Sequence, residues 1–510
     1  MSPDQHNGQP QHQRLQDVLR ESLAPHPAAV PAARPGGAKT VVPVQGGAAS
    51  PRGLGDLPGT LPVEWELITS LRDAVSDDIV AADEAQPLPT ETARRERSRS
   101  LVAERVSQWA VQYGRSHAPL STAQVENVAQ AVYDAVFHAG PLQKYLDDPD
   151  VENIVVDGST VLVEYFDRPT EQVPAVAGTD EELIDLINRL ASGSGHRERR
   201  LSPTSPMANF RLPDGSRASA TLLTTRPFLG IRRHRIRKSS LEQLQEWGTL
   251  SPSLGAFLHA LVLARKNILI AGDMGVGKTS LLRALGRKIP AEERVITLES
   301  DRELFLDEDT EGGAHVLAME SRESNGEVIE GQQVGRISVA DMFPQTLRML
   351  ATRVIVGEVR DNEAIAMLQA MSAGGAGSMC TVHAAYPKLV LPRMVTLCQG
   401  MHRDDVHELV GTAVNFIVFL RQIDQTRIGG RRHRFVSHVL EVSPGEEGRP
   451  SLQEIFAPAT GGDPRAVPKL APSCLEELEN EAGFHRAWLT VPQHGTWPAP
   501  LNLVGRAVAA

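Results

Sequence analysis

The segment GDMGVGKT, residues 272–279, matches the pattern GxxxxGK[ST]; it follows an apolar, strand-like run and opens a helical one. Its glycines let the backbone curl so that successive N–H groups point at phosphate oxygens, and the positive end of the helix adds to that field. Lys278 would reach the β- and γ-phosphates of ATP, and Thr279 would ligate Mg²⁺. A chance match is expected in about one chain of this length in a hundred. We therefore predict a nucleotide site formed by Gly272, Asp273, Met274, Gly275, Val276, Gly277, Lys278, Thr279 and Ser280.

Two other apolar segments end in carboxylates. RVIVGEVRD places Glu358 at the end of a predicted strand, where a carboxylate beside a phosphate loop can polarise the water that attacks the γ-phosphate. An ordinary surface glutamate that caps the next turn is the alternative, and the nearby phosphate loop favours the catalytic interpretation. In VITLESDREL, Glu299 and Glu303 follow the preceding strand. They could orient Mg²⁺ and water, or they could belong to a solvated helix start.

Two further segments could contact phosphate. SAGGAGSMCTVHA, residues 372–384, combines small residues, which allow a tight bend or a close approach to the backbone, with the single histidine His383. RPFLGIRRHRIRK, residues 226–238, is strongly basic. It could be a nucleic-acid patch, or a source of arginines that reach the phosphates of a neighbouring site, or a solvated basic face. The solvated face is the simplest interpretation for most of these side chains.

The elements that must position these residues follow from the hydrophobic pattern. From residue 266, strand-like runs alternate with helical segments: NILIAG, a helix from about Lys278, VITLE, RVIVGE, a helix through NEAIAMLQAM, and SMCTVH. Alternating buried strands and helices of this length predict an α/β fold with a mostly parallel sheet and flanking crossover helices. VNFIVFLRQ and RFVSHVLEVS predict further strands.

The rest of the chain differs in texture. A helical pattern with Ser121 as N-cap precedes a small α/β domain, which contains a strand pair at Asn153–Val156 and Val161–Tyr165, a helix near Glu181–Ser192 and a second strand pair. We predict a disordered Pro/Gly/Ala-rich arm over 1–60, a helical segment over 61–139, the small α/β domain over 140–245, the P-loop domain over 246–458 and an irregular tail over 459–510.

Composition limits the class of protein. A length of 510 residues predicts two or three domains, and a net charge of −11 argues against a protein that coats nucleic acid through a general positive field. The three cysteines form no CxxC pair, so neither a disulfide framework nor a tetracysteine zinc site is expected. The polar N-terminus does not look like a signal peptide, and there is no apolar run of about 18 residues that could span a bilayer. We expect a cytoplasmic protein that reaches a membrane only through partners.

Taken in order, these motifs resemble the secretion ATPases of the type II/type IV superfamily, and within it the CpaF/TadA branch that powers Tad-type pili. The absence of a tetracysteine zinc module also fits this branch. The resemblance covers roughly residues 140–456 and rests on GPLQKYLDDPDVENIVVDG, FRLPDGSRASA, GIRRHRIRK, GDMGVGKTS, VITLESDREL, LRMLATRVIVGEVRDNEAIAMLQAM and GSMCTVHA. It implies a RecA-like P-loop ATPase core preceded by the small α/β domain, and a homo-oligomer, a hexameric ring, that hydrolyses ATP with Mg²⁺. It also implies inner-membrane platform proteins as partners. The acidic net charge and the lack of a recognisable DNA-binding module lead us to expect no stable nucleic-acid partner.

The resemblance further implies roles for single residues. Lys278 and Thr279 match the Walker A pair and Glu358 the Walker B glutamate. His383 matches the histidine box, so we expect the glycine-rich loop to approach the γ-phosphate and His383 to sense it. Glu299 and Glu303 match the family's acidic box. Arg217, Arg232 and Arg233 stand where the family places its phosphate-sensing arginines. The predicted catalytic set is Glu358, Glu299, Glu303, His383, Arg217, Arg232 and Arg233.

The chain also departs from the family pattern. Gly375 and Ala376 stand where a histidine and an acid are usual, and residues 350–353 read LATR where RPDR is usual. These departures bear on the rate and on nucleotide coupling more than on binding. An ATP-hydrolysing motor is the leading interpretation. A nucleotide-binding ring subunit with slow turnover and a DNA-translocating motor are the alternatives, and the acidic net charge weighs against the last.

Overall fold

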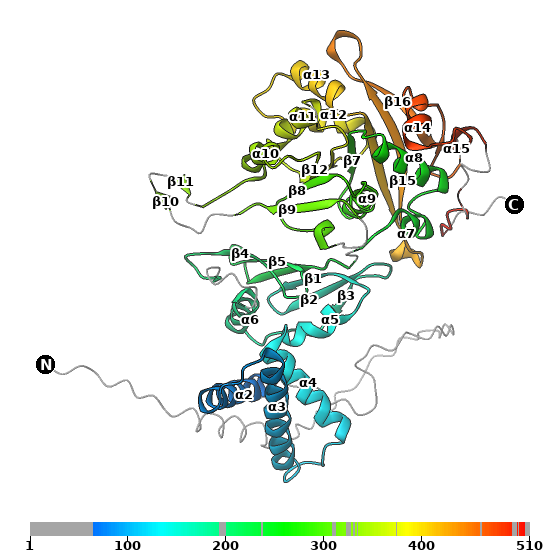
Figure 1. The fold of residues 1–510 in the computed structure, drawn as a ribbon. Coiled ribbons are helices and arrows are strands. Elements are labelled where there is room, and N and C mark those ends of the chain that lie inside the picture. The colour runs from blue at the N-terminus through cyan, green and yellow to red at the C-terminus, as the bar shows by residue number, and fades with distance from the viewer. Residues whose placement is uncertain are drawn as a thin grey trace, which may run out of the picture. The chain divides into compact units, whose positions relative to one another are not determined.

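The computed structural model describes residues 65–504 apart from 193–199, 236–237, 309–312, 323–327, 330–331, 334, 374, 460–461, 492–496 and 498. The predicted arm over residues 1–60 lies outside the described residues. The chain divides into two units, one of Met1–Glu164 with Thr170–Arg233 and one of Tyr165–Pro169 with His234–Ala510 (Figure 1).

Three long helices open the first unit: α2 (Trp65–Ala85), α3 (Glu91–Tyr113) and α4 (Thr122–Phe137). The start of α4 confirms the predicted cap, because the Ser121 hydroxyl accepts the Gln124 N–H and the Gln124 side chain accepts the Ser121 N–H. Apolar side chains from the three helices pack into one core. The core is thus built from the amphipathic pattern that predicts the helices.

A six-stranded sheet in the order β3-β2-β1-β6-β5-β4 follows these helices. The neighbours β1 and β2 are the first predicted strand pair, and β4 and β5 pair antiparallel as the second. The predicted helix is α6 (Asp180–Ser192). The strands are β1 (Val151–Asp157), β2 (Thr160–Tyr165), β3 (Glu171–Val173), β4 (Met207–Arg211), β5 (Arg217–Thr221) and β6 (Phe228–Arg232), with the short helices η1 (Gly140–Leu142) and α5 (Gln143–Asp147) before them.

A nine-stranded sheet forms the centre of the second unit, in the order β17-β16-β15-β14-β7-β13-β12-β8-β9. The strands from β14 to β9 pair in parallel, and β15, β16 and β17 add antiparallel at one side. This arrangement confirms the predicted α/β fold with a mostly parallel sheet. The strands are β7 (Ile268–Gly272), β8 (Arg294–Glu299), β9 (His315–Glu320), β12 (Arg353–Val359), β13 (Met379–His383), β14 (Phe416–Asp424), β15 (Arg432–Ser443), β16 (Ser451–Pro458) and β17 (Ala466–Pro468), with a separate pair β10 (Val328–Ile329) and β11 (Gln332–Gln333).

Helices contribute to a core on each face of this sheet. Because successive strand residues point to opposite faces, Ile268 and Ile270 of β7 join the core with α8 and α9, whereas Leu269 and Ala271 join the core with α10 to α13. None of the helices in the described ranges is both long and apolar enough to cross a bilayer. The helices are α7 (Leu241–Glu246), α8 (Pro252–Leu263), α9 (Lys278–Gly286), α10 (Val339–Arg348), α11 (Glu363–Ser372), α12 (Val390–Leu397), α13 (Arg403–Ala413), α14 (Leu475–Ala482) and α15 (Ala487–Thr490), with η2 (Leu306–Glu308), η3 (Pro387–Leu389), η4 (Thr426–Ile428) and η5 (Glu446–Gly448).

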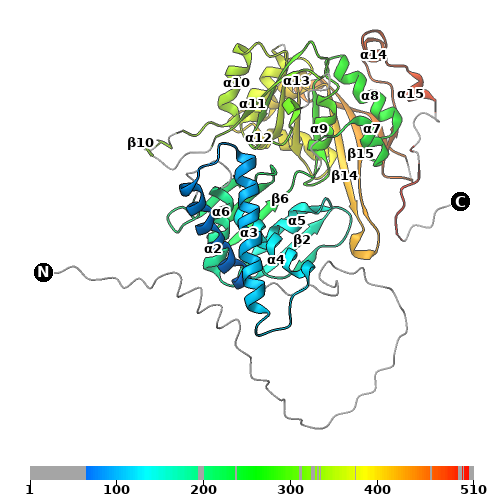
Figure 2. The same ribbon diagram turned by 60° about the horizontal axis from the view of Figure 1, so that its bottom comes forward.

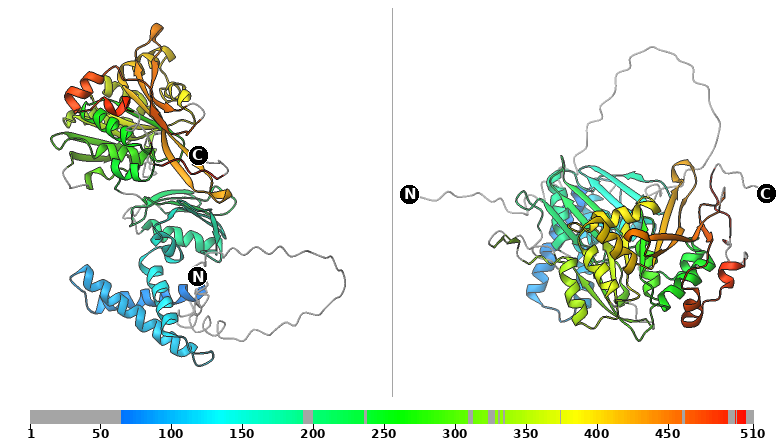
Figure 3. Two further views of the ribbon diagram at one scale, coloured as in Figure 1. Left: turned by 90° about the vertical axis from the view of Figure 1, so that its right-hand side faces the viewer. Right: turned by 90° about the horizontal axis from the view of Figure 1, so that it is seen from above.

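The last part of the chain is more regular than its sequence predicts. β17 pairs with β16, and α14 and α15 pack on α8 (Figure 3). Phe484 lies against Phe257 with ring centroids 5.7 Å apart, and Ser473 donates from its N–H and its hydroxyl to Glu441. The prediction of an irregular tail over 459–510 is therefore wrong for these segments. Elements this short show no periodicity, and contacts distant in the sequence hold them.

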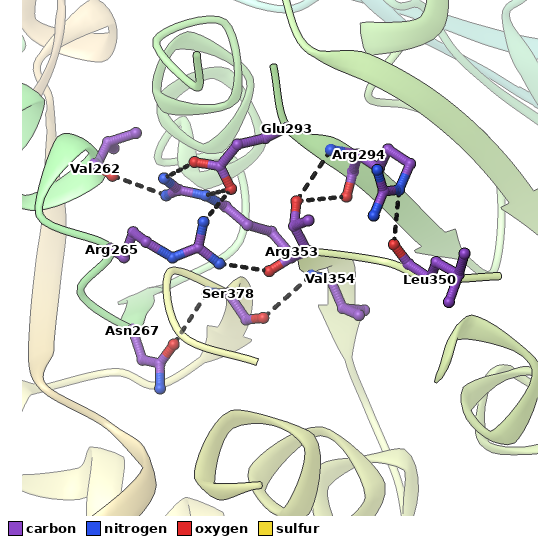
Figure 4. Close-up of polar contacts among 10 residues, drawn as sticks. Val262, Arg265, Asn267, Glu293, Arg294, Leu350, Arg353, Val354 and Ser378 are labelled. Atoms are coloured by element: carbon purple, nitrogen blue, oxygen red, sulfur yellow. Dashed lines mark hydrogen bonds and ion pairs between the residues drawn. The ribbon is translucent and has the colours of Figure 1, made fainter. Parts of the chain in front are cut away.

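A buried ion network lies at the amino ends of β8 and β12 (Figure 4). The side chain of Arg353 is 1% exposed; it donates to both carboxylate oxygens of Glu293, at 2.8 and 2.5 Å, and to the Val262 carbonyl at 2.8 Å. Arg265 pairs with the same carboxylate and donates to the Thr352 carbonyl. The network ties the end of α8 to the starts of two central strands.

Replacement of Glu293 should show what this network contributes. Glu293→Gln leaves the Arg353 guanidinium buried without a counter-charge, so the free energy of unfolding of the second unit should fall by about 3–5 kcal/mol. Burial alone would raise the pKa of Glu293, but Arg353 and Arg265 outweigh it and hold that pKa below its usual value. The stabilisation should therefore be present at neutral pH and be lost as the pH falls through the folded-state pKa.

Urea denaturation followed by circular dichroism measures the difference. Glu292→Gln is the matched control, because Glu292 is exposed and precedes Glu293 in the chain, and it should change stability by no more than about 0.5 kcal/mol. Equal losses in the two variants would contradict a structural role for the network.

Candidate active site

The predicted phosphate loop, Gly272–Thr279 and hereafter the P-loop, runs from the carboxyl end of β7 to the first turn of α9. Gly272, Gly275 and Gly277 have φ values of +154°, +72° and +97°, a backbone conformation that residues other than glycine rarely adopt. A Cβ on Gly272 would also lie 2.7 Å from the carbonyl oxygen of Leu420 on the neighbouring strand β14. The spacing of glycines in the sequence is thus required by the geometry of the loop.

Lys278, the first residue of α9, is buried and its ammonium contacts three acceptors. It donates to the carbonyl oxygens of Gly272 at 3.1 Å and Asp273 at 2.7 Å, and it lies 3.0 Å from Nδ1 of His383. An ammonium can only donate, so Nδ1 of His383 is the acceptor in this contact. His383 ends β13 and pairs in register with Gly272, which explains why the two side chains meet.

The other nitrogen of His383 contacts the predicted catalytic carboxylate. Nε2 of His383 lies 2.7 Å from Oε1 of Glu358, and Arg360 donates to Oε2 of Glu358 at 2.8 Å. Burial would raise the pKa of Glu358, but the hydrogen bonds from His383 and Arg360 outweigh burial and lower it to about 2. Glu358 is therefore ionised at neutral pH. The resulting chain Lys278–His383–Glu358–Arg360, hereafter the relay chain, joins three predicted residues to one that was not predicted.

The two carboxylates of the acidic segment differ in their surroundings. Glu299 ends β8 and is 2% exposed, and its Oε2 accepts the N–H groups of Glu303 at 2.7 Å and Leu304 at 2.8 Å. Burial raises the pKa of Glu299 to about 7 despite these two hydrogen bonds. Arg283 of α9 donates to the carbonyls of the same two residues, Glu303 and Leu304. Glu299 thus holds the loop that carries Glu303, and its proposed part in orienting Mg²⁺ and water stays a prediction.

The remaining P-loop residues fit a magnesium nucleotide. Thr279 and Ser280 are half-buried in the first turn of α9, where a helix N-terminus favours anions. Met274 is exposed, and its N–H donates to Oδ1 of Asp273 at 2.7 Å. Over the described ranges, no group of three or more His, Cys, Asp or Glu side chains could hold a metal ion. A buried ammonium and left-handed glycines at a helix N-terminus suit phosphate oxygens, and Thr279 offers a hydroxyl ligand to the Mg²⁺ that accompanies them.

The predicted phosphate-sensing arginines lie in the first unit, whereas the P-loop lies in the second. Arg217 and Arg232 are directly opposite each other on β5 and β6. Arg233 donates to the carbonyl oxygens of Asp148 and Val151, so at least part of its guanidinium is engaged within its own unit. Contact of these three arginines with phosphate stays a prediction.

The glycine-rich loop does not lie where we expected it. Residues 375–378 precede β13, and the N–H of Ser378 donates to Asn267 at the start of β7. Gly377, with φ +86°, lies so close to Arg353 that a Cβ there would be 2.6 Å from its guanidinium. Since β13 runs parallel to β7, the loop and the P-loop lie at opposite ends of these strands. The expectation that the loop approaches the γ-phosphate at the P-loop is therefore wrong. His383 reaches the site because it lies at the carboxyl end of β13, away from the loop.

Two arginines at the site were missed. Arg360 stands in GEVRD, two residues after Glu358, so the alternation of a strand end could have indicated it. Arg434 of β15 donates from Nε to the carbonyl oxygen of Gly275 in the P-loop at 2.8 Å. No local signal marks Arg434, because its place depends on the pairing of β15 with β14 beside β7.

The chain is similar to several known proteins. Residues 137–441 match the family model described as "Type II/IV secretion system protein". The chain is 28% identical to the protein VirB11 of Agrobacterium fabrum over 322 residues, which is 55% of this chain and 88% of that protein. It is 35% identical to the type IV secretion system protein PtlH of Bordetella pertussis over 187 residues, 35% of this chain and 51% of PtlH. A crystal structure of the ATPase DotB of Legionella pneumophila aligns with a TM-score of 0.43 at 20% identity, covering 59% of this chain and 80% of DotB.

The environment of Glu299 predicts an unusual pH dependence. Because the folded state binds a proton more tightly than the unfolded state between pH 4.5 and about 7, the stability of the wild type should fall as the pH rises through this window. The full difference is about 3 kcal/mol. Glu299→Gln mimics the protonated acid and can still accept the two N–H groups, so this dependence should disappear.

Urea denaturation at pH 5.5 and pH 8 provides the measurement. Glu299→Gln should be more stable than the wild type at pH 8 and should lose most of that advantage at pH 5.5. Glu299→Ala is the comparison, because it leaves the N–H groups of Glu303 and Leu304 without this acceptor and should destabilise at both pH values. Parallel pH profiles for the wild type and Glu299→Gln would contradict the raised pKa.

Proposed function

The chain belongs to the type II/IV secretion system protein family, and we propose that it is the cytosolic motor of a Tad-type pilus or a related secretion apparatus. It is a P-loop ATPase. The observation that carries the proposal is the relay chain, in which the P-loop lysine and the strand-end glutamate bind the two nitrogens of one histidine. A site that only stores nucleotide needs the lysine but has no use for an ionised carboxylate held in this way.

Glu358 has the properties of a group that polarises water. It is ionised, it stands at the carboxyl end of β12, and both its oxygens are oriented by neighbours. His383 fixes one oxygen and Arg360 the other, so the carboxylate cannot rotate freely. We propose that Glu358 polarises the attacking water and that Arg360 orients the carboxylate of Glu358.

His383 connects this carboxylate to the substrate phosphates. Lys278 now divides its ammonium between two carbonyls and Nδ1 of His383, and a phosphate oxygen would compete with these acceptors. When Lys278 turns to the phosphate, His383 loses a donor while it keeps Glu358. The histidine can therefore report phosphate occupancy to Glu358 through a single imidazole ring. Mg²⁺ held by Thr279 would neutralise charge on the phosphates.

We further propose that copies of the chain assemble into a hexameric ring, in which hydrolysis drives rotation of one domain against the next. Arg217, Arg232 and Arg233 would then reach the phosphates held by a P-loop, as arginine fingers do in other P-loop enzymes. Inner-membrane platform proteins would receive the motion, and they would bring the motor to the inner face of the plasma membrane. Membership of the type II/IV secretion system protein family and the similarity to the type IV secretion system protein PtlH support secretion as the setting.

The position of two residues argues against the alternative of a slow nucleotide-binding subunit. That alternative rested on the unusual Gly375 and Ala376, and these residues lie at the amino end of β13, at the opposite end of the strand from His383. The residues at the carboxyl end keep their polar groups. The acidic net charge of −11 continues to weigh against a DNA-translocating motor.

Replacement of Glu358 tests the catalytic proposal. Glu358→Gln keeps the shape of the side chain and removes the charge that polarises water, so steady-state ATP hydrolysis should fall by about 10²–10⁴-fold. Binding of ATP should persist, because every P-loop contact is unchanged. Phosphate release measures hydrolysis, and a fluorescent ATP analogue measures binding. Glu408→Gln, the same change at an exposed position of α13, is the control and should hydrolyse at the wild-type rate. Wild-type turnover in Glu358→Gln would remove the motor proposal.

Assembly is tested on the same variant. With hydrolysis blocked, ATP should hold the subunits together, and mass photometry of Glu358→Gln with ATP and Mg²⁺ should detect a hexamer of the 55.3 kDa chain. Lys278→Ala, which cannot hold phosphate, should assemble less under the same conditions. Monomers alone at every protein concentration would exclude the ring.

A further inference from the structure

The strands β14 and β15, on the antiparallel side of the nine-stranded sheet, lie beside the P-loop. β14 pairs in parallel with β7 up to Leu420 opposite Gly272, and then continues for four more residues to Asp424. β15 runs back along this extension as a long hairpin (Figure 2). The carbonyl oxygen of Leu420 leaves no room for a Cβ at Gly272, and its side chain would lie 4.0 Å from a Cβ at Gly277. The extension therefore flanks the turn that binds phosphate.

The side chain of Arg434 connects β15 to the P-loop. It stands opposite Gln422 in the β14–β15 register, and cross-strand partners project from the same face. Its Nε donates to the Gly275 carbonyl oxygen at 2.8 Å and lies 3.1 Å from Oε1 of Gln422. The guanidinium also stacks on Phe166 of the same unit, with Cζ 4.6 Å from the ring centroid. Gln422 and Phe166 thus fix the orientation of the guanidinium that holds Gly275.

We propose that Arg434 is a positioning residue for nucleotide binding, which holds the P-loop peptide between Gly275 and Val276 in the orientation that binds phosphate. In a trans peptide the carbonyl oxygen and the following N–H point in opposite directions. A donor that holds the Gly275 oxygen on the outer side therefore holds the Val276 N–H on the inner side. Glycine at φ +72° offers little resistance to a flip of this peptide, so the side-chain contact supplies the restraint.

The restraint predicts a specific kinetic signature. Arg434→Met removes the donor and keeps much of the length, so the P-loop should bind phosphate-bearing ligands about tenfold more weakly. KM for ATP should rise by a similar factor, whereas kcat should stay within about twofold, because the hydrogen bond from Arg434 is made to the phosphate-binding turn at Gly275. Arg434→Lys can still donate to the Gly275 carbonyl and should recover part of the affinity.

Direct binding separates this proposal from the proposed motor function. Titrations of the full chain with ADP and with pyrophosphate do not depend on turnover, and both ligands should lose affinity equally in Arg434→Met. Arg421→Met is the matched control. It removes the same charge from an exposed side chain on β14, next to Gln422, and it should bind both ligands as the wild type does.

Three outcomes would overturn the proposal. Loss of ADP affinity with unchanged pyrophosphate affinity would show that Arg434 contacts the nucleoside. Equal losses in Arg434→Met and Arg421→Met would reduce the effect to general charge. A fall in kcat at constant KM would place Arg434 elsewhere in the cycle. If Arg434→Met does not fold, as judged by circular dichroism, Gln422→Leu replaces it, since loss of the partner that orients Arg434 should shift binding in the same direction.

Discussion

The parallel pairing of β7 with its two neighbours is the constraint on which the nucleotide site depends. The register places His383 of β13 and Leu420 of β14 opposite the same residue, Gly272. One neighbour therefore supplies the imidazole that binds Lys278, and the other supplies the carbonyl that restricts position 272 to glycine. A shift of β13 by one residue would turn His383 to the other face of the sheet and would break the relay chain. Backbone hydrogen bonds thus determine which side chains can take part in the chemistry.

The amino and carboxyl ends of the central strands differ in how their charged side chains are paired. At the amino end, the carboxylate of Glu293 neutralises the buried guanidinium of Arg353. At the carboxyl end, Lys278 and Glu358 are joined through the two ring nitrogens of His383. β12 and β13 carry residues of both ends, and the Thr381 hydroxyl donates to the Gly357 carbonyl where the register of β12 shifts. The contacts of Arg353 at the amino end thus hold the strand whose carboxyl end carries Glu358.

The sequence alone predicts features that lie within one continuous segment. It does not predict contacts that depend on the register between strands distant in the chain. The P-loop, Glu358 and His383 could be placed at strand ends, because apolar runs and the GxxxxGK[ST] pattern are local signals. The contact of Lys278 with His383 depends on register, and Arg434 depends on a hairpin far along the chain, so neither could be predicted. The place of the glycine-rich loop follows from the strand order alone, because a loop before a strand parallel to β7 must lie away from the P-loop. The sequence does not predict the helices α14 and α15, because these short helices are stabilised by contacts with α8, which is remote in the sequence.

The contacts of Lys278 also bear on how fast products can leave. Its ammonium has all three donors engaged by protein acceptors, so an arriving phosphate exchanges one set of partners for another and adds few new hydrogen bonds. On departure, the same protein acceptors take the ammonium back, and no buried charge is left without a partner. We expect such an exchange to shorten the residence time of the spent nucleotide. For an enzyme that must release nucleotide in every cycle, a second set of partners for this lysine therefore favours product release.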